Sequence, residues 1–377
     1  MKIKTWKIVM SLLIISCFSY GEGVAQYIAR MIFLPLSFLL SLHFQRYKLV
    51  PKTTIGIFPI YLFFILFTTI FYNYLINQTS MKAFWKFLEL LLLVGTLWNV
   101  GQFFNRMNIQ VYSLIDYTFF NLSLICFFSI MLEFIFGKQN LTELSGYFPI
   151  INPNSVGTIF GVQVLYFMLR KKIILASVML TMTILSGSMS ALIAIVISIV
   201  YFFTIKLLPN LRGITPNWKI GALVSVGILV LYWIIGLLSD DFKRLSGRAN
   251  LWEKLFEALS EKLGVFNGIG YGYVRTIVGI ETGIAKTLHN SYLEVLFSVG
   301  YLGFVLFIIL NIILIMKLNK VRLPRSVRDP VIIILIFLLI KSLTSSSLVY
   351  LSVESVLYGT VLLLIPRIVR RQDGQSL

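Results

Sequence analysis

The sequence is poor in the residues that hold disulfide-bonded domains and metal sites together. Only 13% of its 377 residues are charged, and it contains only two cysteines and two histidines. Cys17 and Cys126 both lie inside apolar runs, which excludes a disulfide framework and a thiolate metal site. His43 and His289 are too few for a multi-histidine metal site.

The sequence is instead rich in long apolar runs. Hydrophobic residues make up 58% of the chain and the mean hydropathy is +0.88, whereas soluble domains are about 45–50% apolar and about 25% charged. This composition excludes a soluble enzyme, a disordered chain and a collagen-like fibre. A membrane helix needs about 20 mostly apolar residues, so residues 1–377 are predicted to form a single membrane domain.

Twelve apolar runs are predicted to be membrane helices, because they are continuous rather than alternating and because lipid admits only helices or closed barrels. The predicted spans are residues 6–20, 24–42, 55–75, 81–100, 113–136, 156–169, 173–189, 190–208, 220–238, 292–316, 331–348 and 350–366. The predicted fold class is therefore all-α, a polytopic membrane protein with about 12 transmembrane helices. The lysines before the first run resemble a signal peptide, but an uncleaved first span fits the remaining topology better.

The positive charges predict the orientation of these spans. The chain has 33 Lys and Arg against 15 Asp and Glu, a net charge of +18. With the N-terminus inside, 21 of the cations fall in cytoplasmic segments, 10 fall outside, and Arg30 and Lys341 fall within spans. Cytoplasmic loops collect Lys and Arg, so both termini are predicted to be cytoplasmic. The basic balance then reflects topology and attraction to anionic lipid, and it does not indicate nucleic-acid binding.

Residues 239–291 form the only long hydrophilic stretch and are predicted to lie outside. Long loops in compact proteins tend to carry binding or catalytic residues, so this loop is a candidate for function. Within it, residues 249–263 place leucines on one face and glutamates and lysines on the other, which predicts an amphipathic helix on the membrane surface. Gly268 and Gly270 follow in a turn that allows close backbone approach to a phosphate. A plain surface loop explains these glycines at least as well.

His289 and Asn290 end this loop and begin the next predicted helix. Gly300 lies 11 residues after His289, which is about three helical turns, so the two residues share a face. Gly300 and Gly303 are expected to let the helix pack closely against a neighbour. A neutral imidazole at the positive end of the helix dipole can accept a proton, although a histidine that only caps the helix is an equally good interpretation.

Several arginines and intramembrane charges are candidates for substrate contact. Arg244 and Arg248 flank the outer end of a span, where arginine binds phosphate or simply contacts lipid headgroups. Five charged residues fall in the outer half or middle of predicted spans: Arg30, Glu89, Glu294, Lys341 and Glu354. Such charges are functional candidates, and their shared outer location indicates a polar cavity open to the outside. Internal ion pairing is the favoured interpretation for Glu89 and Lys341.

An ordered series of these residues resembles a known family. The series is Ser246-Gly247-Arg248, Leu251-Trp252, the glycines at 268, 270 and 272, and His289-Asn290 before Gly300 and Gly303. It is similar to the O-antigen ligase and O-antigen polymerase superfamily of bacterial polysaccharide assembly, over roughly residues 150–316. Asn152-Pro153-Asn154 and Ser186-Gly187-Ser188 add to the resemblance. The family often has an arginine where this chain has Met189, and Arg30, Arg244 and Arg275 are the candidates to replace it.

The resemblance implies an enzyme of the bacterial inner membrane with a periplasmic active site. Such an enzyme moves a glycan from undecaprenyl diphosphate to an acceptor and needs neither a metal nor another cofactor. The resemblance makes His289 and Arg248 the candidate catalytic residues. The candidate substrate-binding residues are Arg244, Arg275, Asn290, Arg30 and Glu294, and the candidate structural residues are Gly300, Gly303, Gly268 and Gly270.

The expected activity is that of a repeat-unit polymerase for O-antigen, capsule or exopolysaccharide. Its acceptor is a lipid-linked repeat unit, and a chain-length regulator protein is a candidate partner. An O-antigen ligase, with the lipid A core or a protein as acceptor, is the alternative within the family. A transporter or flippase for lipid-linked glycans is the alternative from another class. It requires charges through the membrane midplane and pseudo-symmetric halves, and the sequence has no internal repeat.

Overall fold

The computed structural model of the chain describes residues 2–18, 24–44, 81–106, 111–136, 144–149, 151–207, 256, 268–269, 290–320, 325–344 and 352–370. These residues contain the helices α1 (Lys2–Ser16), α2 (Val24–Leu42), α4 (Met81–Arg106), α5 (Val111–Phe136), α6 (Pro153–Leu169), α7 (Ile173–Leu185), α8 (Met189–Leu207), α12 (Ser291–Lys320), α13 (Arg325–Lys341) and α14 (Val353–Arg370), with a short 3-10 helix η4 (Ser342–Thr344). The only strand-like pairing in this part is one isolated bridge between Gly146 and Ile151. The all-α prediction is confirmed for the described residues.

Several helix ends differ from the predicted span ends: α1 ends at Ser16 instead of 20, and α13 ends at Lys341 instead of 348. α2 begins and ends at the predicted residues, but α7 ends at Leu185 instead of continuing to 189. Gly187 has a φ of 63°, a conformation that glycine adopts without strain and that ends the helix. A turn of three residues therefore separates α7 from α8. The predicted spans 55–75 and 220–238 lie outside the described residues.

Two described segments are long and apolar enough to cross a membrane, Tyr112–Phe136 in α5 and Ser291–Met316 in α12. Shorter apolar segments lie in α1, α2, α7 and α8. Large apolar side chains of α5, among them Phe120, Phe128 and Ile135, are exposed on the surface of the protein. An exposed apolar surface of this kind suits contact with lipid. These features support a membrane protein, and the count of twelve spans stays a prediction.

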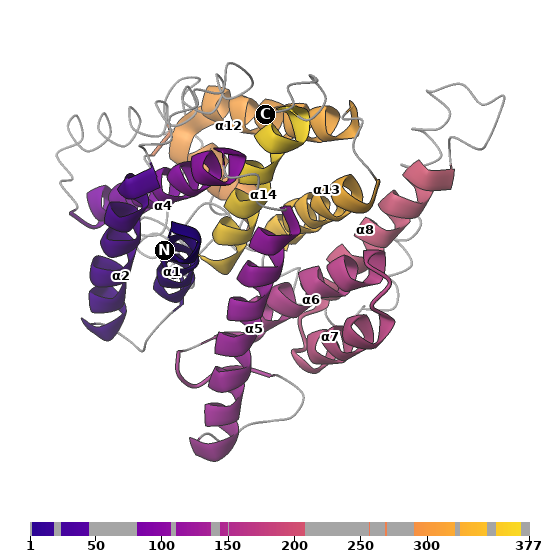
Figure 1. The fold of residues 1–377 in the computed structure, drawn as a ribbon, viewed down its shortest axis with the longest axis horizontal. Helices are drawn as coiled ribbons and strands as arrows, with labels where there is room; N and C mark the ends of the chain where they lie inside the picture. The colour runs from indigo at the N-terminus through magenta and orange to yellow at the C-terminus, as the bar shows by residue number, and fades with distance from the viewer. Residues whose placement is uncertain are drawn as a thin grey trace.

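α13 and α14 lie between two groups of helices (Figure 1). α1, α2 and α4 form one group, and α6, α7 and α8 form the other. α6 is a central helix, because every residue from Val156 to Tyr166 is buried. Gly161 lets it approach α13, since a Cβ at this position would lie 3.0 Å from the ring of Phe337. This packing fixes α6 against α13.

A polar cluster joins the other end of α6 to the start of α5. The Tyr166 hydroxyl donates to Asp116 Oδ1 at 2.6 Å, and Arg170 Nη1 donates to both carboxylate oxygens of Asp116 at 3.0 Å. The Arg170 guanidinium also lies 4.7 Å from the centre of the Tyr112 ring. Arg170 belongs to the cations assigned to the cytoplasmic side, so the opposite ends of these helices are the predicted outer ends.

Candidate functional site

Three helix ends that the charge distribution assigns to the outer side meet in the structure. They are the start of α6, the turn between α7 and α8, and the start of α14. Ser188 Oγ donates to Asn154 Oδ1 at 3.1 Å, which joins the turn to α6. Thr158 Oγ1 lies 3.2 Å from Glu354 Oε1, which joins α6 to α14 across 196 residues of sequence. Thr158 Oγ1 also donates to the main-chain oxygen of Asn154 at 2.9 Å, so a continuous chain of hydrogen bonds connects the three helix ends.

The local sequence explains why α6 starts here and packs so closely on the turn. Asn152 caps the helix, because its Oδ1 accepts from the Ser155 amide at 2.7 Å, and a proline follows at the first helical position. Gly157 lies directly against the turn, where an added Cβ would be 2.4 Å from Ser188 Cβ and 2.9 Å from Ser186 Oγ. Only glycine leaves room for the serines at this position.

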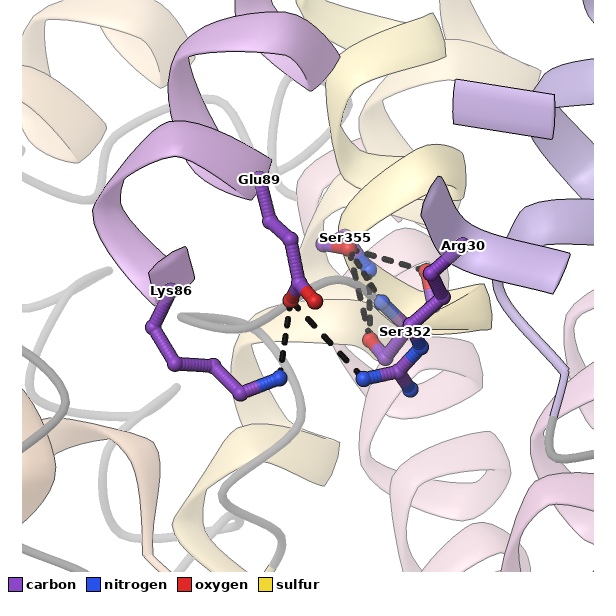
Figure 2. Close-up of polar contacts among 5 residues, drawn as sticks. All are labelled: Arg30, Lys86, Glu89, Ser352 and Ser355. Carbon is purple, nitrogen blue, oxygen red and sulfur yellow. Dashed lines mark hydrogen bonds and ion pairs between the residues drawn. The ribbon is translucent and has the colours of Figure 1, made fainter. Parts of the chain in front are cut away.

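A second polar group, made of Arg30, Lys86 and Glu89, lies between α2 and α4 (Figure 2). Lys86 Nζ donates to Glu89 Oε2 at 2.8 Å, and Arg30 Nη1 lies 3.8 Å from the same oxygen. The Glu89 side chain is 3% exposed and that of Arg30 is 14% exposed. Internal ion pairing of Glu89 is thus confirmed. Because two cations share one carboxylate, this charged cluster carries a net positive charge.

The start of α14 lies next to the charged cluster. Its first turn is closed by reciprocal bonds, from the Ser352 amide to Ser355 Oγ at 2.9 Å and from the Ser355 amide to Ser352 Oγ at 3.1 Å (Figure 2). Figure 2 shows Ser352 and Ser355 beside the Arg30 side chain, and α14 packs against α4. The charged cluster and the polar chain that ends at Glu354 are therefore neighbours.

The start of α12 holds two of the predicted substrate-binding residues. Asn290 Oδ1 accepts from the amides of Tyr292 and Leu293 at 3.0 and 3.1 Å, so this side chain caps the helix. Glu294 lies in the first turn and is fully buried. The cap fixes the start of α12 at Ser291, and the capping residue itself directly follows His289 in the sequence.

The predicted structural glycines act on α12 in different ways. The continuous helix expected over 292–316 is interrupted at Gly300, which has a φ of 73° and a ψ of −176°. Gly268 packs against the backbone of the same helix, because a Cβ there would lie 2.5 Å from the Phe297 carbonyl oxygen. Gly303 lies against Val299, whose Cγ2 would be 2.5 Å from an added Cβ. Gly303 meets a side chain of its own helix and Gly268 meets the backbone of α12, so the expected close packing of this helix on a neighbouring helix stays a prediction.

Several predicted site residues lie outside the described residues: His289, Arg248, Arg244, Arg275 and Gly270. The predicted amphipathic helix 249–263 does so as well, apart from Phe256, whose ring lies 5.2 Å from that of Phe297 on α12. Among the described candidates, Asn290, Glu294, Gly300 and Gly303 lie along α12, and Gly268 packs against its second turn. Arg30 instead belongs to the charged cluster of α2 and α4.

Sequence reasoning missed Thr158 and treated Glu354 only as one of several intramembrane charges. Thr158 lies four residues after Asn154 and therefore on the same face of α6. This spacing is the sequence signal that could have identified Thr158 as a site residue. Met189 is exposed at the first position of α8, next to Ser188. In the described part of the chain, no group of three His, Cys, Asp or Glu residues is placed to hold a metal ion.

Part of the chain matches a known protein family. Residues 174–308 match the family model of the O-antigen ligases. The matched segment runs from α7 through α8 to the first part of α12, and it includes the positions of Arg248 and His289. No curated protein matches the chain at a significant level. The family match confirms the resemblance seen in the sequence and, with the apolar helices, supports an O-antigen ligase/polymerase-like membrane protein of polysaccharide biosynthesis.

Proposed function

We propose that the protein is a polysaccharide repeat-unit polymerase of the bacterial inner membrane. It transfers a glycan from undecaprenyl diphosphate to a lipid-linked repeat unit on the periplasmic side, and both of its termini are cytoplasmic. The observation that carries the proposal is the family match over residues 174–308, which contain Arg248 and His289 in the expected order. The meeting of α6, α8 and α14 at their predicted outer ends supports a site on one side of the membrane.

The proposed chemistry is a single displacement at the anomeric carbon. The acceptor hydroxyl oxygen forms a bond to this carbon, the bond to the diphosphate oxygen breaks, and the diphosphate leaves with the electron pair. Arg248, with Arg244, Arg275 or Arg30, stabilises the charge that grows on the diphosphate in the transition state. His289 accepts the proton of the attacking hydroxyl. The lipid tail stays in the bilayer, which requires a site near the membrane surface.

An O-antigen ligase is the second candidate, because the matching family model carries that description. The two activities differ only in the acceptor. A ligase uses the lipid A core or a protein, whereas a polymerase uses a second lipid-linked repeat unit. Both use the same donor and the same proposed catalytic residues.

Purified full-length protein incubated with lipid-linked repeat units alone distinguishes these activities. A polymerase converts them into a ladder of longer lipid-linked chains without lipid A, and the ladder persists in the presence of a metal chelator. A ligase makes no product until the lipid A core is added. Absence of transfer to either acceptor, with donor supplied, contradicts the proposed function.

A further inference from the structure

Glu354 is a buried carboxylate that needs hydrogen-bond donors. It is 5% exposed and lies in the first turn of α14, where the Ser352 and Ser355 bonds close the helix end. A carboxylate in this position interacts favourably with the helix dipole. As a carboxylate it accepts hydrogen bonds and donates none. Burial without donors is costly for such a group, so its neighbours decide what it does.

Thr158 supplies only part of what Glu354 needs. Its Oγ1 lies 2.9 Å from the main-chain oxygen of Asn154 and 3.2 Å from Glu354 Oε1. One hydroxyl has one proton, so these two acceptors compete for it. In the described part of the chain, no other residue hydrogen-bonds to Glu354 and no lysine or arginine forms a salt bridge with it. Oε2 is therefore open to a donor that comes from a bound molecule.

Asn154 offers a complementary group, and Thr158 links its main chain to this carboxylate. Its Oδ1 accepts from Ser188 Oγ at 3.1 Å, which orients the amide and leaves Nδ2 as a donor without a described partner. Asn154 is exposed at the start of α6, and Thr158 contacts both its main chain and Glu354. A hydroxyl group donates to one neighbour and accepts from another. A carboxylate acceptor and an amide donor that Thr158 connects therefore suit the hydroxyl groups of a sugar.

We infer that Asn154, Thr158 and Glu354 form a subsite that binds sugar hydroxyl groups of the glycan substrate. The inference rests on the proposed function and names three binding residues that the family match does not cover. A diphosphate is a poor ligand here, because an ionised phosphate has few protons to donate and is repelled by Glu354. The diphosphate instead suits the net positive charge of Arg30, Lys86 and Glu89 on α2 and α4. Sugar and diphosphate thus contact different helices.

The test measures binding of the free repeat-unit oligosaccharide, without lipid or phosphate, to the purified full-length protein. Glu354→Gln keeps the side-chain shape but replaces one acceptor oxygen with an amide donor. Loss of a hydrogen bond to a charged group weakens binding about tenfold to a hundredfold. Asn154→Asp removes the donor and should weaken binding by a similar factor. Glu133→Gln on α5 is the matched control, because it makes the same chemical change outside the subsite and should bind like the unmodified protein.

The binding results for these variants support or overturn the sugar subsite. Oligosaccharide binding that is weaker in Glu354→Gln and Asn154→Asp, with inorganic diphosphate binding unchanged, supports the subsite. Equal binding by Glu354→Gln and the unmodified protein, or no binding by the unmodified protein, overturns it. If Glu354→Gln fails to fold, Thr158→Ser, which keeps the hydroxyl, and Thr158→Val, which removes it, give the same comparison. Binding through Glu354 without any glycan transfer leaves the subsite standing and contradicts the proposed polymerase activity.

Discussion

The Ile269 amide donates a hydrogen bond of 2.7 Å to the carbonyl oxygen of Phe297, and this bond attaches the predicted outer loop to α12. In an unbroken helix the Phe297 carbonyl would accept from the amide four residues later. The break at Gly300 releases this carbonyl for Ile269. Gly268 makes the approach possible, because its missing side chain lets the two backbones touch. We expect this contact to hold the interior of the loop, at Ile269, against the second turn of α12.

Gly268→Ala tests the attachment of the loop. The new Cβ would lie 2.5 Å from the Phe297 carbonyl oxygen and from the Ser298 carbonyl carbon. Such overlap typically costs about 1–3 kcal/mol, so the melting temperature of the protein in detergent should fall. Hydrogen exchange at Ile269 should also become faster, because its amide loses its acceptor. Ile269→Val keeps the amide and serves as the control, and unchanged exchange in Gly268→Ala contradicts the attachment.

Gly300→Ala tests the helix break itself. The backbone at this position, with φ of 73° and ψ of −176°, belongs to a region that is essentially restricted to glycine, and a residue with a Cβ costs about 1–3 kcal/mol there. We expect lower thermal stability and reduced glycan transfer. Ser298→Ala is the control on the same helix, because the buried Ser298 hydroxyl has no hydrogen-bond partner in the described part of the chain. Equal stability of Gly300→Ala and Ser298→Ala would exclude a required break.

The helices were predictable because an apolar run of about 20 residues is a signal within one stretch of sequence. α2 occupies 24–42 as predicted. The end of α7 was not predictable from hydropathy, because Gly187 is the single residue that marks the turn between two adjoining apolar runs.

The candidate site was less predictable for a physical reason. Thr158 and Glu354 are 196 residues apart, and a contact between distant helices leaves no periodic pattern in either one. The break at Gly300 is also invisible to hydropathy, because apolar residues continue on both sides of it. Ion pairing of Glu89 was predictable, since a charge inside a span needs a partner. Its two partners, on α2 and on its own helix, emerged only from the fold.

Glu89→Gln tests the charged cluster of α2 and α4. The substitution leaves Arg30 and Lys86 close together without the carboxylate that they share. Removal of one partner of a buried ion pair costs about 3–5 kcal/mol, and the partial exposure of Lys86 places the expected loss of stability at the lower end. Thermal unfolding in detergent measures the effect, with Glu133→Gln as the matched control.

The double variant Arg30→Gln with Glu89→Gln separates stability from substrate binding. Because it removes a cation together with the carboxylate, its stability should recover relative to Glu89→Gln. If Arg30 contacts the diphosphate, glycan transfer should stay low despite the recovered stability. Full transfer by a stable double variant would limit Arg30 to a structural role.

The orientation in the membrane is tested with reporters that are active only outside the cytoplasm. A reporter fused near Lys262 should be active and one fused near Arg325 should be silent, because cytoplasmic segments collect the majority of Lys and Arg. A fusion after Lys172, in the turn between α6 and α7, should be silent as well. The reverse pattern would move the proposed site to the cytoplasmic face.

His289 is the residue on which the proposed chemistry depends most. His289→Ala should lose glycan transfer by about 10²–10⁴-fold, the usual contribution of a general base, while binding of the lipid-linked donor is retained. His289→Gln can still form hydrogen bonds but cannot take up a proton, so it should be nearly as impaired as His289→Ala. Transfer by the unmodified protein should rise with pH through the titration of the imidazole and then level off, because only the neutral ring accepts a proton. An active His289→Gln variant would mean that the histidine only orients the acceptor, and the proton would then pass to Glu294, Glu354 or water.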